Sequence, residues 1–138
     1  FGDYIVVSSF SGVAGHVTVE DHAVIGAMSG VHQFVKVGAL AMVGGMSKIV
    51  QDVCPFVIAD GNPARVVGLN SVGIARNNIS ADVKSALKEA YRLLFRSGLK
   101  LNDAIQEMEQ ELPSTPEIEH LLRFLRNCDR GLCRTRDR

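Results

Sequence analysis

Two histidines, His16 and His32, stand out in a segment that otherwise consists mainly of aliphatic and small residues, GHVTVEDHAVIGAMSGVHQF at 15–34. An imidazole ring changes its charge near neutral pH and can donate or accept a hydrogen bond, so two such rings can bind one polar ligand. Whether these two rings meet depends on the elements that carry them. The spacing of the aliphatic residues predicts those elements.

Val or Ile occurs at every sixth position over residues 7–49, a spacing that fits neither an α-helix nor an ordinary strand. A second register, four residues after each of these, contains only small or β-branched residues. This period predicts the hexapeptide repeat of a parallel β-helix, in which three hexads form one triangular coil around a dry core. The registers are Val7, Val13, Val19, Ile25, Val31, Val37, Val43 and Ile49, and Ser11, Val17, Ala23, Ser29, Val35, Ala41, Ser47 and Val53.

The repeat predicts where the histidines lie. Three hexads separate 13–18 from 31–36, so we expect His16 and His32 on one face of successive coils. Neither occupies the inward register, and an offset of two residues and one coil places their Cα atoms roughly 8 Å apart. The two rings could flank a polar ligand, or they could be surface histidines without a function. We expect His22, one hexad after His16, on another face in a structural or exposed role.

Composition favours a globular chain, with 46% hydrophobic residues, 22% charged residues and a formal net charge of zero. We therefore expect no nucleic-acid partner. No apolar run reaches the ~18 residues of a transmembrane segment and no leader segment is visible, so we expect a cytoplasmic protein. Cys54, Cys128 and Cys133 lack zinc-ligand spacing and suit a reducing compartment as free thiols, although the last two could pair.

The chain changes character in its second half, because only three of its fifteen basic residues precede residue 76. We expect three parts: β-helix coils at 1–57, an irregular connector rich in Pro and Gly at 58–78, and an α-helical domain at 79–138. The chain also begins inside the repeat, which would leave an unpaired strand edge that favours association or aggregation. We therefore expect these residues to be the C-terminal part of a longer chain.

Three helices are predicted after the connector. Ser80 and Asn102 are the expected N-caps of the first two, and the STPE capping box at 114–117, with Pro116 in the first turn, starts the third. We interpret the acidic segment 107–111 and the basic tail as solvated. The predicted core stripes are Val83, Leu87, Tyr91 and Leu94; Ile105, Met108 and Leu112; and Ile118, Leu121, Leu122 and Leu125. The basic tail comprises Arg130, Arg134, Arg136 and Arg138.

Longer motifs carry a resemblance to a known family. The segments AGHVTVEDHAVIGAMSGVHQFVKVGALAMVGG at 14–45 and QDVCPFVIADGNPARVVGLNSVGIAR at 51–76 contain the motifs G-H-V, V-H-Q-F, G-N-P-A-R and G-L-N-x-x-G-x-x-R. Together with AYRLLFRSG and RGLCR nearer the C-terminus, they resemble the C-terminal half of the acyl-ACP:UDP-N-acetylglucosamine O-acyltransferases, which begin lipid A synthesis. The resemblance extends over nearly the whole chain.

The resemblance implies a homotrimer of left-handed β-helices, each followed by a helical domain, with active sites between subunits. The implied reaction transfers a 3-hydroxyacyl chain from acyl carrier protein to the 3-hydroxyl of UDP-N-acetylglucosamine, with no metal or other cofactor. A histidine acts as the general base and a backbone N–H stabilises the oxyanion. That histidine lies about one coil before the G-H-V motif in the family, so the present chain lacks the general base.

The family motifs assign roles to four residues at the catalytic end. Gly15 would offer the oxyanion N–H, since glycine allows close approach of the thioester. His16 and His32 would contact the sugar nucleotide, and His16 would also support the reacting geometry. Gln33 would add an amide to the same pocket.

Other matched positions concern the nucleotide and the acyl chain. Asn70 and Arg76 would hold the nucleotide, the guanidinium of Arg76 being suited to phosphate. Gly45 would set the acyl-chain length, and its missing side chain predicts a longer chain. Val72 and Pro63 depart from the family pattern, so contacts to the ribose and the nucleotide end would differ.

The implied partners are the carrier protein and UDP-N-acetylglucosamine. Basic residues of the helical domain could meet an acidic carrier protein through Lys84, Lys88, Arg92 or Arg96. Two alternatives stay open. The chain could belong to a related hexapeptide N-acyltransferase, against which the G-L-N-x-x-G-x-x-R connector argues. It could also be a non-catalytic fragment that trimerises or binds the carrier.

Overall fold

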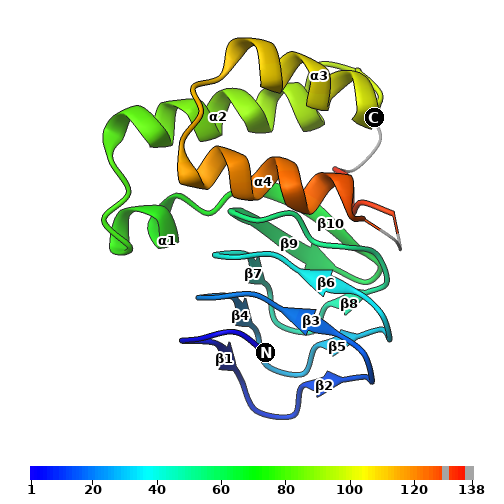
Figure 1. Cartoon of the computed structure of the whole chain (residues 1–138). Coiled ribbons are helices and arrows are strands. Elements are labelled where there is room, and N and C mark those ends of the chain that lie inside the picture. Colours follow the sequence, from blue (N-terminus) through cyan, green and yellow to red (C-terminus); the bar gives the residue numbers. More distant parts are fainter. Residues whose placement is uncertain (129–130, 136–138) are drawn as a thin grey trace.

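The first half of the molecule is a parallel β-solenoid of about three turns, seen in a computed structural model that describes residues 1–128 and 131–135 (Figure 1). The first five strands each pair in parallel with the strand one coil later, as Val6 does with Val24 and Val24 with Met42. The predicted left-handed parallel β-helix with a following helical part is confirmed. Its strands are β1 Val6–Val7, β2 Gly12–Val13, β3 Thr18–Val19, β4 Val24–Ile25, β5 Gly30–Val31, β6 Lys36–Val37, β7 Met42–Val43 and β8 Lys48–Ile49.

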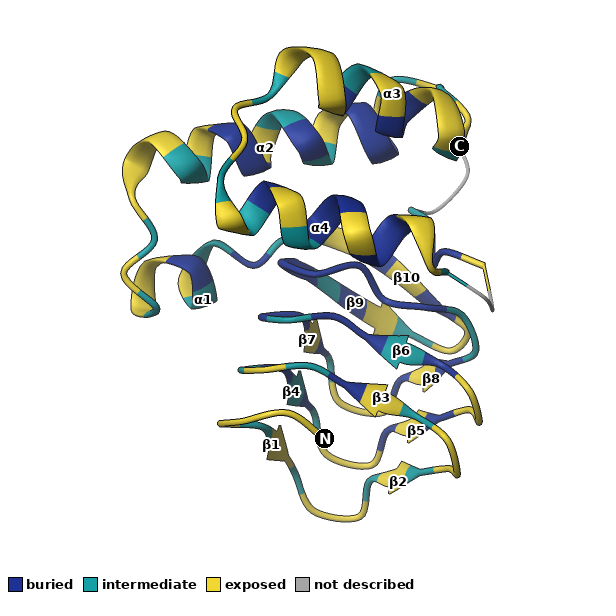
Figure 2. Ribbon diagram, viewed as in Figure 1, coloured by how far each residue is buried: buried dark blue, intermediate teal, exposed yellow. Residues whose placement is uncertain are grey.

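These strands form three flat faces. Face A contains β1, β4 and β7, face B contains β2, β5 and β8, and face C contains β3 and β6. The predicted aliphatic register points inward and is buried from Val19 onward, whereas Val7 in the first coil is 39% exposed. Ser29 in the second register is buried, and its hydroxyl donates a hydrogen bond to the carbonyl of Gly44 at 2.9 Å. The core therefore accommodates this polar group without leaving it unpaired. Figure 2 shows this burial increasing towards the helices.

Each hexad ends in a corner residue whose φ lies in the left-handed region, between 55° and 66°, although none is glycine. Such a backbone costs about 1–2 kcal/mol per residue, so the surroundings must hold it in place. Backbone bonds between coils do so: the N–H of Phe34 donates to the carbonyl of Gly15, and the N–H of Met46 to that of Ala27. Corner AB holds Phe10, Met28 and Met46, corner BC holds His16 and Phe34, and corner CA holds Tyr4, His22 and Leu40.

The segment after the coils is more regular than predicted. Strands β9 (Val57–Gly61) and β10 (Ala64–Leu69) form an antiparallel hairpin, and β9 pairs in parallel with β7, so the hairpin covers the last coil of face A. The short helix α1 (Ser71–Arg76) follows. The Pro and Gly residues indicated turns correctly. The residues between these turns form two strands, whose side chains alternate between more buried and more exposed positions. The bounds 1–57, 58–78 and 79–138 stay a prediction.

Three longer helices lie across the end of the β-helix: α2 Ala81–Phe95, α3 Leu101–Glu111 and α4 Pro116–Arg126 (Figure 1). Ser80 caps α2 as predicted, because its side chain accepts the N–H of Val83. The prediction for Asn102 is wrong, since α3 begins at Leu101 with Lys100 as N-cap. Leu101 packs against the core, and a later start would leave it outside the apolar stripe.

The start of α4 differs from the prediction by one residue. The side chain of Thr115, not that of Ser114, accepts the N–H of Ile118. Pro116 is in the first turn as predicted, and its fixed φ and missing N–H make the residue before it the N-cap. Within the three predicted stripes, Val83, Tyr91 and Leu112 are half-buried, and Leu87, Leu94, Ile105, Met108, Ile118, Leu121, Leu122 and Leu125 are buried.

The helices and the β-helix share one continuous cluster of buried residues. Cys54 lies in this cluster, and burial raises the pKa of its thiol well above the usual value. Cys54, Cys128 and Cys133 are all free, as predicted. Glu20 on the β-helix side accepts the N–H of Ala39 and lies 2.9 Å from Nε2 of His120 in α4, so one carboxylate joins the two parts.

The charged segments of the helical part behave differently from one another. Glu109 in the acidic segment is exposed and pairs with Arg126, which agrees with a solvated face. Arg134 is not freely solvated, because it donates to the carbonyl of Leu94 and lies over the ring of Phe95. The other basic tail residues, Arg130, Arg136 and Arg138, lie outside the described residues. Within the described ranges, no helix is both long and apolar enough to cross a bilayer.

Candidate functional site

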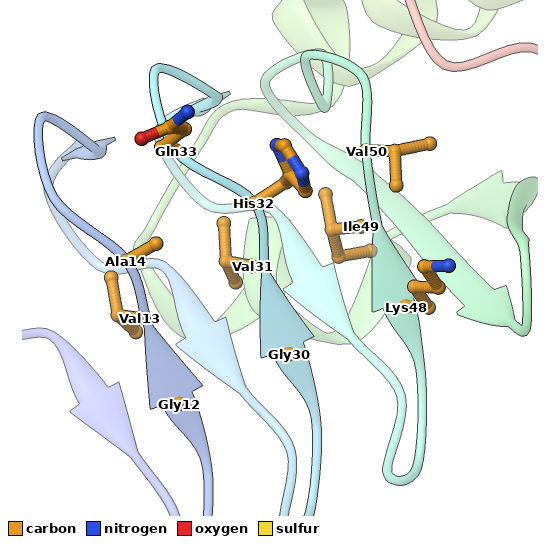
Figure 3. Close-up of a pocket in the computed structure, with 10 residues that line it drawn as sticks. All are labelled: Gly12, Val13, Ala14, Gly30, Val31, His32, Gln33, Lys48, Ile49 and Val50. Atoms are coloured by element: carbon orange, nitrogen blue, oxygen red, sulfur yellow. The ribbon is translucent and has the colours of Figure 1, made fainter.

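An open groove of about 520 Å³ runs along the outside of face B. Figure 3 shows that its floor is nearly bare at Gly12 and Gly30, while Lys48 closes one end of the same row and His32 and Gln33 lie towards corner BC. The groove follows from the strand register, which stacks Gly12 beside Gly30 and Gly30 beside Lys48 on the outer surface. The first two members of this row therefore expose backbone where other faces carry side chains.

Packing within the described chain does not require these glycines. A Cβ added to Gly12 or Gly30 would meet no described atom within 4 Å, and neither residue has a left-handed φ. By contrast, a Cβ on Gly26 would lie 2.6 Å from the backbone nitrogen of Gly45, so that glycine is structurally required. The bare row leaves the backbone of face B accessible to a ligand or to another chain.

Corner BC brings His16, His32 and Gln33 together in two successive coils. The ring of His16 stacks on that of Phe34, with centroids 4.9 Å apart and planes inclined by 4°. His32 and Gln33 immediately precede Phe34 and line the groove, whereas His16 does not line it. The pair predicted to share a face thus lies at one corner. His22 stacks on Tyr4 at corner CA, away from this site.

Gly15 is placed where its amide group is available. It is exposed, and its carbonyl accepts the N–H of Phe34 at 3.3 Å. Within residues 1–128 and 131–135, no hydrogen bond from the Gly15 N–H is found. This N–H belongs to the peptide between Ala14 and Gly15 and can donate to a developing oxyanion.

Gly45 lies at corner AB, on the other side of face B from His16, and is exposed beside Met46. A Cβ here would come 3.3 Å from the carbonyl oxygen of Ala27, and the φ is not left-handed. A side chain can therefore be added at Gly45 at the cost of a small local shift.

Asn70 and Arg76 lie at the third corner, CA. The amide nitrogen of Asn70 donates to the carbonyl of Leu40 at 2.8 Å, and its oxygen caps α1 by accepting the N–H of Gly73 at 3.1 Å. Asn70 is only 7% exposed, so it has a structural role that the sequence did not reveal. Arg76 is exposed in the last turn of α1.

The two departures from the family pattern lie near these residues in sequence. Val72 is 62% exposed on α1, and Pro63 is exposed in the turn between β9 and β10.

The expected site residues occupy three different corners of the three-sided β-helix. A single chain brings together Gly15, His16, His32 and Gln33, but it places Gly45 and the pair Asn70 and Arg76 elsewhere.

Sequence reasoning missed Phe34 and Lys48 as neighbours of the site. Both could have been found from the 18-residue coil, because Phe34 is one coil after His16, and Lys48 is one coil after Gly30. The hexad registers drew attention to the inward positions only.

Comparison with known proteins gives a consistent match. Residues 52–133 match the family described as "Udp N-acetylglucosamine O-acyltransferase; Domain 2". A relative from Thermodesulfovibrio yellowstonii named acyl-[acyl-carrier-protein]–UDP-N-acetylglucosamine O-acyltransferase is 53% identical over 133 residues, covering 96% of this chain and 52% of the relative. A relative of the same name from Anaeromyxobacter sp. is 39% identical over the same shares.

Solved structures agree with this. A UDP-N-acetylglucosamine O-acyltransferase from Moraxella catarrhalis superimposes with a TM-score of 0.90 at 45% identity, over 96% of this chain and 51% of that one. The corresponding protein from Acinetobacter baumannii gives 0.92 at 42% identity, over 96% and 52%. The chain therefore spans about half the length of the relatives that it matches.

Proposed function

This chain belongs to the UDP-N-acetylglucosamine O-acyltransferase family, and we propose that it is the C-terminal half of an enzyme of lipid A synthesis. The enzyme transfers a 3-hydroxyacyl chain from acyl carrier protein to the 3-hydroxyl of UDP-N-acetylglucosamine. The observation that carries this proposal is the 53% identity to a relative named for these two substrates, over 96% of the chain. The general base lies in the half that precedes these residues.

The proposed roles of the residues follow the geometry of corner BC. An upstream histidine removes the proton of the sugar hydroxyl, whose oxygen attacks the thioester carbonyl, and the carrier thiol leaves with a proton. The Gly15 N–H donates to the oxyanion. His16 and His32, with Gln33 beside them, bind the sugar nucleotide at the edge of the groove. No step requires a metal or a cofactor.

We also propose that the enzyme is a homotrimer whose sites lie between neighbouring chains. The support is the distribution of the expected site residues over three corners: His16 at BC, Gly45 at AB and Arg76 near CA. A second copy can bring its own corners AB and CA to corner BC of the first. Corner AB also carries an exposed apolar column, Phe10, Met28 and Met46, of the kind that a partner surface covers.

The helical part is the proposed docking surface for the acidic carrier protein. Lys88 and Arg96 are exposed on and just after α2, whereas Arg92 pairs with Glu89. Two exposed cations in the helical part suit electrostatic attraction of an acidic partner. The free thiols suit the reducing cytoplasm, where we propose that the enzyme acts.

The test is acyl transfer from 3-hydroxyacyl carrier protein to UDP-N-acetylglucosamine, measured on this chain and on the full-length protein that contains it. We expect activity from the full-length protein only, and a decrease of at least about tenfold for His16→Ala, since a contact to the reacting sugar is lost. The product should be an ester, which separates the proposal from an N-acyltransferase that would form an amide.

His22→Ala is the matched control, because His22 occupies an equivalent stacked corner position and is not among the residues proposed to contact the substrates. It should retain the activity of the unsubstituted protein. A folded full-length protein that transfers no acyl group, or that makes an amide, would contradict the proposed function. Equal losses for His16→Ala and His22→Ala would contradict the role of His16.

A further inference from the structure

The ring of Phe34 is half-exposed next to the proposed site. Packing in the buried core does not explain why an aromatic residue occupies this position. Phe34 is 49% exposed and makes no part of the buried core. Its ring lies parallel to that of His16, with centroids 4.9 Å apart and planes inclined by 4°. Aromatic rings at this separation attract each other beyond the effect of area alone.

Phe34 also holds the backbone beside this stack. Its N–H donates to the carbonyl of Gly15 at 3.3 Å, so Phe34 contacts both the peptide that joins Gly15 to His16 and the imidazole of His16. The two contacts use different parts of Phe34. A substitution of its side chain therefore perturbs the imidazole and leaves the backbone bond in place.

We propose that Phe34 is a positioning residue that acts through His16. The stack covers one face of the imidazole and restricts its rotation, while it leaves the ring edge with its two nitrogens free to contact the ligand at corner BC. A fixed imidazole binds the sugar nucleotide without first losing rotational freedom. The inference rests on the proposed function, because it gives His16 its ligand.

The side chain of Phe34 can be replaced without adding strain to the backbone of the corner. Phe34 has a left-handed φ of 66°, and Leu40 occupies the equivalent position of the next hexad with a φ of 57°. Leucine is thus tolerated at such a corner. Phe34→Leu removes the ring and keeps an apolar side chain, while Phe34→Tyr keeps the ring.

The first experiment is steady-state kinetics on the full-length protein. We expect Phe34→Leu to lower kcat/KM for UDP-N-acetylglucosamine by about two- to tenfold, the range of one aromatic contact, with KM for the acyl carrier unchanged. Phe34→Tyr should restore the parent value. Tyr4→Leu, which removes the equivalent stack on His22, should have no effect on these constants.

A double-mutant cycle separates positioning from a direct or structural role. If Phe34 acts through His16, Phe34→Leu should cause no further loss in a His16→Ala background. An equal loss in both backgrounds would overturn the proposal, since Phe34 would then contact the substrate itself or stabilise the fold. Thermal unfolding of each variant identifies the latter.

The stack itself has a spectroscopic signature that does not depend on catalysis. The ring protons of His16 should shift downfield in Phe34→Leu, measured by NMR on protein labelled at histidine, while those of His22 stay unchanged. Unmoved His16 protons would overturn the proposal. If the parent protein transfers no acyl group, the proposed function fails, and these shifts still decide whether Phe34 holds the imidazole.

Discussion

At the scale of single residues, the side chains around the site combine structural and proposed chemical roles. Asn70 is the clearest case, because its amide caps α1 at Gly73 and also ties this helix to Leu40 of the β-helix. A Cβ on Gly73 would lie 2.4 Å from the Asn70 amide nitrogen, so a larger residue there would displace this amide from its two hydrogen bonds. A loss of activity on replacing Asn70 would therefore not by itself indicate nucleotide binding.

We predict that Asn70→Ala lowers the free energy of unfolding by about 2 kcal/mol, because a helix cap and a buried hydrogen bond are both lost. Asn70→Ser keeps a side-chain oxygen that can cap the helix and places no charge beside the Leu40 carbonyl, so its effect should be smaller. Urea unfolding followed by circular dichroism measures both. Asn102→Ala is the control: Asn102 lies inside α3 and should cost under about 0.5 kcal/mol. A comparable loss at Asn102 would show that it caps α3 after all.

At the scale of elements, the helices start where packing and proline place them, and side-chain hydroxyls adapt. Ser114 and Thr115 both precede Pro116, and either could have capped α4. In the structure Thr115 accepts the N–H of Ile118, while Ser114 donates to Glu119. The position of α4 matters because His120 on this helix meets Glu20 of the β-helix.

Thr115→Ala should therefore destabilise the protein by about 1 kcal/mol, whereas Ser114→Ala should cost less than half of that. Thermal unfolding of the two variants compares them directly, and hydrogen exchange of the first-turn amides of α4 localises the effect. Exchange should accelerate at Ile118 in Thr115→Ala only. The opposite order of the two variants would favour the capping box predicted from the sequence.

At the scale of the whole molecule, the expected site residues lie at different corners of the β-helix. His16 lies at corner BC and Arg76 near corner CA, so a site that uses both needs two chains. If both residues serve one site, as proposed, a single copy would hold only part of it, and the proposed trimer would take part in the chemistry.

Mixing two inactive full-length variants tests this arrangement. His16→Ala and Arg76→Ala should each lose activity, since each removes one contact from every site. After unfolding and refolding together in equal amounts, about a quarter of the sites should combine an intact His16 from one chain with an intact Arg76 from its neighbour. Acyl transfer should then recover to about that fraction. No recovery, although the mixed chains co-assemble, would contradict a shared site.

The β-helix could be predicted from the sequence because its signal is local and repeated. A spacing of six between Val or Ile residues sets the inward register hexad by hexad, and the 18-residue coil predicts His16 and His32 on one face of successive coils. The apolar stripes of the three longer helices were also visible, since helical spacing is a property of neighbours in the chain.

Only the tertiary structure decided the rest, because it depends on contacts between distant residues. The hairpin of β9 and β10 forms on the strand β7, and Asn70 is buried by reaching Leu40, thirty residues earlier. The stacking of Phe34 on His16 arises where two coils meet. The separation of Asn70 from corner BC likewise follows from the hairpin, which folds onto β7 and brings Asn70 to Leu40, a contact that the hexad period does not predict.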